Sequence, residues 1–142
     1  MQVFIIGTAL ETFENLDKKR LNKQLIECKQ ILNVYNCTKQ AWKNHPIVKS
    51  YRPYEKWLRI YTYMLEDFLS EKSDLLMLMS YNKWLQDNKP PFHTQEYFDQ
   101  MKRRLFTKDE KFYEQFSYLG KSEVNWYFVD DEWRYYKNGK RI

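Results

Sequence analysis

The sequence predicts an all-α protein: one compact helical domain over residues 1–142, with an irregular aromatic and basic tail over residues 119–142. The chain of 142 residues is long enough for one core and too short for two comfortable domains. A hydrophobic content of 43% and an aromatic content of 18% favour a folded globule over a disordered chain. Because only 3 glycines and 4 prolines are present, long helices are favoured over a turn-rich β architecture.

The N-terminal part predicts an extended arm and a first helix. Residues 3–6 form a short apolar run that suits an extended arm. Asn15 or Asp17 can cap a helix that ends near Asn33, after which turn-forming residues follow. One face of this helix is apolar at helical spacing, and we expect it to face the core: Leu21, Leu25, Cys28, Ile31 and Leu32.

An irregular connection and a second helix are expected next. Residues 41–48 should be irregular, because Pro46 pushes the residue before it away from helical geometry. Pro53 suits the first turn of a second helix that runs to about Lys72. Apolar and aromatic residues at helical spacing along this segment predict that one face of it is buried.

Three shorter helices should complete the fold. Ser73 can cap a third helix, which ends before the proline-containing segment 88–91. Thr94 begins a fourth helix with aromatic residues on one face and cations on the other. Residues 107–110 have the Thr-x-x-Glu pattern of a capping box, so a fifth short helix should follow to about Tyr118.

Cysteine usage and hydropathy exclude several classes of protein. Cys28 and Cys37 are too few for a disulfide framework, and Cys28 falls on the apolar face, so we expect a buried, reduced thiol. His45 and His93 are far apart and no metal-ligand spacing occurs, so we expect no structural zinc. The apolar run 3–10 is too short to span a bilayer and lacks the basic start of a signal peptide. We expect a cytoplasmic protein with no membrane contact.

The first helix carries the first candidate site. Arg20, Gln24 and Glu27 lie one turn apart, so their polar heads can meet. Glu27 is the only acid within residues 18–30, which carry five cations. A lone carboxylate among cations suits a catalyst that acts on a polyanion. The alternative, which the pattern alone favours, is a solvated helix face on which Glu27 pairs with Lys23.

The second candidate site is the polar and aromatic segment 42–52. Loops held on a rigid scaffold often carry function, and His45 could donate to a phosphate or transfer a proton. Asn44 and Arg52 are its other candidate contacts. Alternatively, Asn44 and His45 satisfy backbone groups around Pro46. The pattern leaves both interpretations open.

The tail is the third candidate. Its aromatic residues alternate with cations: Trp126, Tyr127, Trp133, Tyr135 and Tyr136 with Arg134, Lys137, Lys140 and Arg141. Aromatic rings stack on unpaired bases and cations follow phosphates, so binding of nucleic acid is the favoured interpretation from Trp133 onward. Core filling is the alternative for Trp126 and Phe128. The net charge of +5 agrees with nucleic-acid binding but does not require it, since many basic proteins only have solvated lysines.

Common catalytic motifs do not occur in the sequence. It contains no glycine-rich phosphate loop, no Gly-x-Ser-x-Gly elbow and no His-Glu-x-x-His pair. These omissions remove the usual nucleotide-binding, hydrolase and zinc-protease interpretations.

An ordered series of short motifs resembles a known family. The motifs are Met1-Gln-Val-Phe4, Leu16-Asp-x-x-Arg20-Leu21-x-Lys23-Gln24-x-x-Glu27-x-x-Gln30-Ile31-Leu32, Trp42-x-Asn44-His45-Pro46-x-Val48, Arg52-x-Tyr54-Glu55, and then Leu105-x-x-Lys108-Asp109 and Tyr113. Together they resemble the pyrimidine dimer DNA glycosylase family, typified by phage endonuclease V. The likeness is closest to a branch of short bacterial and phage proteins, and it covers roughly residues 1–118.

This resemblance implies a monomeric helical enzyme that binds double-stranded DNA and moves a nucleotide out of the stack. In the family, the N-terminal α-amine attacks C1′ of the damaged nucleotide, forms an imine, and β-elimination cuts the strand. The corresponding amine is that of Met1, or of Gln2 after processing. The catalytic glutamate of the family falls on Glu27, which would stabilise the cationic intermediate and move protons.

The resemblance also implies the DNA-binding residues. We expect contacts to phosphates or to the extruded nucleotide from Gln2, Arg20, Lys23, Gln24, Asn44, His45 and Arg52. Added affinity is expected from Lys102, Arg103 and Arg104 and from the tail residues Trp133, Arg134, Tyr135 and Lys137. The enzyme would act in the cytoplasm of a bacterial cell or a phage-infected host, without metal or cofactor. Two alternatives stay open: a DNA-binding module that has lost its nucleophile, and a phage protein that uses this fold for protein contacts.

Overall fold

The computed structural model describes residues 2–36, 42–70 and 73–142. Its helices are α1 (Ala9–Asn15), α2 (Lys18–Asn36), α3 (Pro46–Tyr51), α4 (Glu55–Leu69), α5 (Leu75–Asp87) and α6 (Gln95–Lys108), with 3₁₀ helices at Arg52–Tyr54 and Glu114–Leu119. Three strands, β1 (Asn125–Val129), β2 (Glu132–Lys137) and β3 (Lys140–Arg141), form one antiparallel sheet in that order. Within the described ranges, no helix combines the length and the apolar character needed to span a membrane.

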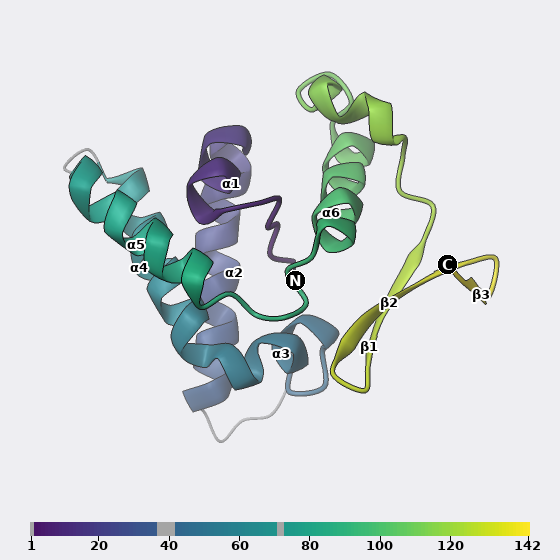
Figure 1. The fold of residues 1–142 in the computed structure, drawn as a ribbon, viewed down its shortest axis with the longest axis horizontal. Helices are drawn as coiled ribbons and strands as arrows, with labels where there is room; N and C mark the ends of the chain where they lie inside the picture. Colours follow the sequence, from purple (N-terminus) through teal and green to yellow (C-terminus); the bar gives the residue numbers. More distant parts are fainter. Residues whose placement is uncertain (1, 37–41, 71–72) are drawn as a thin grey trace.

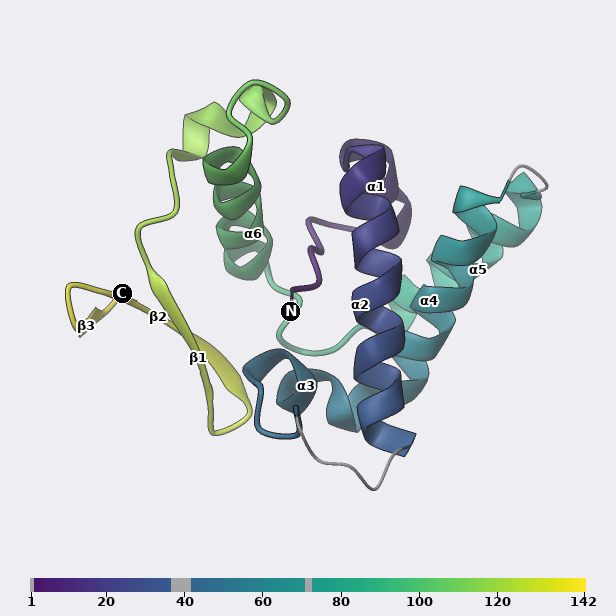
Figure 2. The same ribbon diagram turned by 180° about the vertical axis from the view of Figure 1, so that it is seen from behind.

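The extended N-terminal arm runs between two groups of elements (Figures 1 and 2). On one side, α4 packs against α2 and α5, and α1 packs against α5. On the other side stands α6, with the small sheet beyond it. Residues 3–6 of the arm are buried between these groups, as expected for an apolar extended segment. The arm therefore holds the start of the chain beside both α2 and α6.

The predicted helices of the central part are confirmed, with shifted ends. The first, α2, continues to Asn36 instead of Asn33, and its side chains Gln24 and Glu27 are buried together with the apolar face. The fourth predicted helix is α6, which Thr94 caps by accepting a hydrogen bond from the backbone N–H of Tyr97. The second corresponds to α4; its predicted end at Lys72 lies outside the described residues.

Two short helices correct the sequence-based predictions. The prediction of an irregular segment was wrong for α3, because Pro46 occupies the first helical turn, where proline is favourable, and His45 is its N-cap. Helix α1 was not predicted. Its cap Thr8 accepts a hydrogen bond from the N–H of Glu11, so the Thr-x-x-Glu pattern of residues 8–11 was the available signal.

The predicted capping box at residues 107–110 was also wrong. Thr107 belongs to the last turn of α6, where its hydroxyl donates to the carbonyl of Arg103 at 2.7 Å. The carboxylate of Asp109 instead accepts from the N–H of Phe112 in the following turn. The segment that follows is the 3₁₀ helix Glu114–Leu119 and not an α-helix.

The tail is a sheet and not an irregular segment, so the all-α prediction was wrong in this region. Asp130 and Asp131 both have positive φ, at 53° and 61°, and make the tight turn between β1 and β2. The second turn uses Asn138 and Gly139, a pair that favours two-residue hairpin turns. Alternate residues of β1 face the protein and the solvent, as expected for a half-buried strand.

Cys28 is a free, buried thiol, as predicted. Burial raises its pKa to about 12, so it carries no charge near neutral pH. Cys37 lies outside the described residues.

Candidate active site

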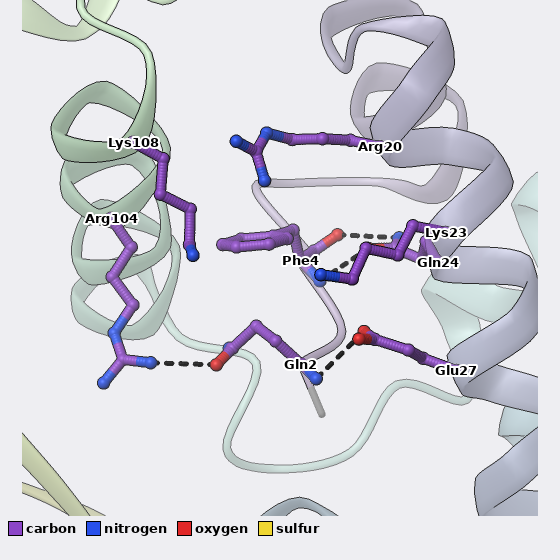
Figure 3. A pocket seen from close by; sticks show the side chains of 8 residues that line it. All are labelled: Gln2, Phe4, Arg20, Lys23, Gln24, Glu27, Arg104 and Lys108. Atoms are coloured by element: carbon purple, nitrogen blue, oxygen red, sulfur yellow. Dashed lines mark hydrogen bonds between the residues drawn. The ribbon is translucent and has the colours of Figure 1, made fainter.

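A hollow of about 220 Å³ opens between α2, the N-terminal arm and α6 (Figure 3). Four of its residues come from α2, two from the arm and two from α6; they are Gln2, Phe4, Arg20, Lys23, Gln24, Glu27, Arg104 and Lys108. Gln2 and Phe4 thus share one site with Arg104 and Lys108, which lie about a hundred positions later in the chain.

Gln24 fixes the arm to α2. Its Oε1 accepts a hydrogen bond from the N–H of Phe4 at 2.7 Å, and its Nε2 donates to the carbonyl of Phe4 at 3.0 Å. Nε2 also donates to the hydroxyl of Tyr61. The side chain is buried, and every hydrogen-bonding atom of its amide has a partner within the protein. Gln24 lines the hollow, as the predicted contact with a nucleotide requires. Its amide oxygen and nitrogen, however, already form hydrogen bonds with Phe4 and Tyr61.

The clamped arm places Gln2 on Glu27. The backbone nitrogen of Gln2 donates to Oε2 of Glu27 at 2.9 Å, a contact drawn as a dashed line in Figure 3. The Glu27 residue is only 9% exposed, so its carboxylate is largely shielded from solvent. The Gln2 side chain accepts from Arg104 at 2.8 Å and donates to the sulfur of Met101 at 3.3 Å. Met1 lies outside the described residues.

Four cations line the hollow together with this single carboxylate. Arg20 forms an ion pair with Asp17 at 3.5 Å and lies over the ring of Phe4. Lys23, Arg104 and Lys108 complete the group. The pKa of Lys108 is lowered by partial burial and by the neighbouring cations, of which Arg20 contributes most. Such a cluster attracts an anion into the hollow.

The predicted residues of the segment 42–52 lie outside this hollow. Nδ1 of His45 accepts from the N–H of Ile47 at 3.2 Å, so it caps α3, and burial lowers its pKa. This is the backbone role that the sequence left as one alternative. Asn44 and Arg52 line a separate, wider hollow beside the turn between β1 and β2, and Arg52 lies 5.2 Å from the ring centroid of Tyr35.

The three consecutive cations of α6, Lys102, Arg103 and Arg104, point in different directions. Of these three, only Arg104 lines the hollow. Lys102 lies over the ring of Phe116, and Nε of Arg103 donates to the carbonyl of Leu119 at 2.9 Å. Successive residues of a helix are about 100° apart, so a run of three cations cannot face one site.

The aromatic residues and the cations of the tail have different surroundings in the sheet. Trp133 and Tyr135 pack inward, Tyr135 being buried with its ring 5.0 Å from that of Trp126. Arg134, Lys137 and Arg141 each pair with a neighbouring carboxylate. Arg134 pairs with Glu132 at 2.8 Å and with Asp130 at 3.1 Å, and Lys137 pairs with Glu123 at 2.7 Å.

Phe4 and Lys108 are members of the site that the sequence did not single out. Lys108 follows Arg104 by four residues on α6, so the two share a helix face. That spacing was the available signal for Lys108. No local signal marks Phe4, because its place in the site follows from its contact with Gln24, twenty positions away.

The fold and the hollow define a helical protein with a shielded carboxylate at a cation-lined site, suited to an anionic substrate. A family model described as pyrimidine dimer DNA glycosylase matches residues 1–72, just over half of the chain. The chain belongs to this family of DNA-repair glycosylases, whose partner is DNA. Searches of curated proteins and of solved structures return no match. The matched segment contains Gln2, Gln24 and Glu27, whereas α6 and the sheet lie beyond it.

Proposed function

We propose that this protein is a DNA glycosylase with abasic-site lyase activity. It acts on damaged or modified pyrimidines in double-stranded DNA, through an imine with the N-terminal amine and with Glu27 as the catalytic carboxylate. The observation that carries the proposal is the 2.9 Å contact between the nitrogen of residue 2 and the carboxylate of Glu27. Membership of the glycosylase family supports the same assignment.

The chemistry needs an amine that is neutral near pH 7. An α-amine has a pKa of about 8, so a usable fraction is unprotonated, whereas an ordinary lysine is almost fully charged. The neutral amine attacks C1′, and the bond from C1′ to the base breaks. The base leaves with the bonding electrons and takes up a proton. The amine nitrogen then loses a proton and the sugar ring opens, which gives the imine.

Strand cleavage follows from the imine. A base removes a proton from C2′, and the 3′ phosphate leaves with the electron pair of its C–O bond. Water then hydrolyses the imine and frees the enzyme. Glu27 is suited to stabilise the cationic imine and to carry these protons, because it is shielded from solvent and adjoins the nitrogen of residue 2. The cations Arg20, Lys23 and Lys108 would hold the phosphates on either side.

Two starts of the chain are compatible with this chemistry. If Met1 is retained, its amine lies one residue before the nitrogen that contacts Glu27. If Met1 is removed, the nitrogen of Gln2 itself becomes the amine. The contact with Glu27 favours the second arrangement.

Borohydride trapping tests the proposal. The protein is incubated with a duplex that contains an abasic site, the imine is reduced, and tryptic mass spectrometry locates the adduct. We expect an adduct on the N-terminal peptide, and its mass distinguishes a start at Met1 from a start at Gln2. An adduct on a lysine would refute the N-terminal nucleophile, and the lack of any adduct would refute the lyase.

The second candidate is a DNA-binding protein without catalysis. The glutamine at position 2 favours it, because a long side chain there hinders removal of the initiator methionine. A retained Met1 would leave the nitrogen at Glu27 as a peptide amide, which is not a nucleophile. The Gln2→Ser variant, whose small side chain permits removal, separates the two candidates. An adduct with Gln2→Ser and none with the natural chain would favour the second candidate.

A further inference from the structure

Residue 2 is held from both sides of the hollow. Its backbone nitrogen donates to Glu27 of α2, and its side-chain Oε1 accepts from Arg104 of α6 at 2.8 Å (Figure 3). Gln24 fixes the arm at Phe4, but the backbone dihedrals before that residue can still turn the nitrogen away from Glu27. The contact of the Gln2 side chain with α6 limits that rotation.

Arg104 takes its orientation from an aromatic ring of the sheet. Its guanidinium carbon lies 4.1 Å from the ring centroid of Trp126, the shortest distance between a cation and a ring in the described part of the chain. Stacking of the planar guanidinium on an aromatic face restricts a side chain that otherwise has many rotamers. Burial lowers the pKa of Arg104, which forms no ion pair within the described ranges. The Trp126 ring and the side-chain carbonyl of Gln2 therefore place this guanidinium without a carboxylate.

Trp126 is itself fixed by packing. It lies on β1 opposite Tyr135 of β2, and the centroids of the two rings are 5.0 Å apart. Its ring centroid also lies 5.8 Å from that of Trp133 and 5.9 Å from that of Tyr97 on α6. A ring packed against three others keeps one orientation. The hairpin of β1 and β2 thus offers Arg104 a fixed surface, and this hairpin lies beyond the segment 1–72 that identifies the family.

We propose that Trp126 is a positioning residue, which orients Arg104 so that its contact with Gln2 keeps the nitrogen of residue 2 against Glu27. This inference rests on the proposed glycosylase function. It gives the C-terminal hairpin a part in the catalytic geometry that requires no contact between Trp126 and DNA. Because the reacting amine must be held at C1′ in every substrate, loss of the contact should slow the reaction without weakening DNA binding.

The test measures single-turnover cleavage of an abasic duplex and, on the same duplex, DNA affinity. Trp126→Leu keeps an apolar side chain and removes the aromatic face. We expect the cleavage rate to fall about two- to thirtyfold, the range that one cation–π contact supports, with affinity within about twofold of the natural protein. Trp126→Phe, which keeps an aromatic face, should retain most of the rate.

A second variant breaks the same series of contacts at its other end. Gln2→Met removes the carbonyl that accepts from Arg104 and keeps a long side chain at position 2, so the start of the chain should be unchanged. We expect a similar fall in rate, and Trp126→Leu should cause little further loss in the Gln2→Met background. This variant leaves the hairpin intact, so a normal rate in Gln2→Met would overturn the proposal even where Trp126→Leu disturbs folding.

Tyr127→Ala is the matched control, because Tyr127 lies next to Trp126 on β1 but is exposed. It should leave rate and affinity unchanged. Losses that add in the double variant would overturn the proposal, as would a loss of affinity in Trp126→Leu that accounts for its loss of rate. Failure of the natural protein to form any abasic adduct would instead refute the proposed function.

Discussion

Gln24 holds Phe4 by both of its backbone polar groups, with 2.7 Å to the N–H and 3.0 Å to the carbonyl. This two-point contact is the pairing that a neighbouring strand would supply, made here by one side chain of a helix. It fixes the register of the arm, so that the nitrogen two residues earlier meets Glu27 at 2.9 Å. The geometry of the candidate site therefore depends on a residue that need not touch the substrate.

Replacement of Gln24 tests this positioning role. In Gln24→Leu, two buried backbone groups of Phe4 lose their partners, which should lower the free energy of unfolding by about 1–3 kcal/mol. We expect the rate of abasic-site cleavage to fall far more than the affinity for DNA, because the arm loses its register. Urea unfolding and single-turnover cleavage measure the two effects. Gln30→Leu is the control, since Gln30 is exposed on the same helix. A normal cleavage rate in Gln24→Leu would contradict the role.

Replacement of Glu27 separates catalysis from binding. Glu27→Gln keeps the shape of the side chain and removes its charge, so the cationic imine loses its stabilising carboxylate. We expect strand cleavage to slow by roughly 10²–10⁴-fold with little change in DNA affinity. Single-turnover kinetics and a binding titration on the same duplex measure both quantities. Glu14→Gln, at an exposed position of α1, should leave both unchanged. If Glu27→Gln weakens binding and nothing else, Glu27 is structural.

The buried His93 predicts a loss of stability in acid. Its Nε2 lies 2.8 Å from the hydroxyl of Tyr51, and burial, with a smaller contribution from Lys89, lowers the pKa of His93 from 6.5 to about 3. Between pH 6.5 and about pH 3, His93 is protonated in the unfolded chain and neutral in the folded protein. Stability from this group is therefore complete above about pH 6.5 and falls as the pH drops toward 3, by up to about 1.4 kcal/mol per pH unit.

His93→Phe isolates that contribution. The variant should lose stability at neutral pH, because the hydroxyl of Tyr51 loses its partner. Its free energy of unfolding should nevertheless depend less on pH between 6.5 and 3 than that of the natural protein. Urea unfolding at several pH values measures both, and the carboxylates contribute equally to the two proteins. Identical slopes would show that His93 is not excluded from protonation.

The cations of the hollow and of the tail should differ in their effect on DNA binding. Lys108 faces the hollow and has no ion-pair partner within the ranges that the structure describes, whereas Lys137 pairs with Glu123. Lys108→Ala should reduce the slope of log affinity against log salt by about 1. Lys137→Ala should change this slope much less, because Glu123 already balances the charge of Lys137. Titrations at several salt concentrations measure the slopes, and equal reductions would show that the tail also binds phosphates.

The sequence alone determined most of the helices and, through its resemblance to the glycosylase family, singled out Glu27 as a candidate. The apolar spacing of α2 and the Thr94 cap of α6 depend on residues within a few turns of each other, so periodicity and capping rules find them. The order of the motifs along the first half of the chain then identified the family, which the match over residues 1–72 confirms. The first hairpin was missed because Asp130 and Asp131 form its turn without a glycine, whereas the Asn138-Gly139 pair was an available signal for the second turn.

Only the tertiary structure decided which residues share the site. The partners of Gln2 are Glu27 and Arg104, which lie 25 and 102 positions away in the chain. Of the consecutive α6 cations Lys102, Arg103 and Arg104, only Arg104 lines the hollow, because successive helix residues point in different directions. Gln24 is buried and binds the backbone of the arm at Phe4. Such contacts result from the packing of distant elements, and local sequence patterns carry no information about the distances between those elements. The sequence could therefore single out Glu27 as a candidate, and the fold determined that the nitrogen of residue 2 lies against it.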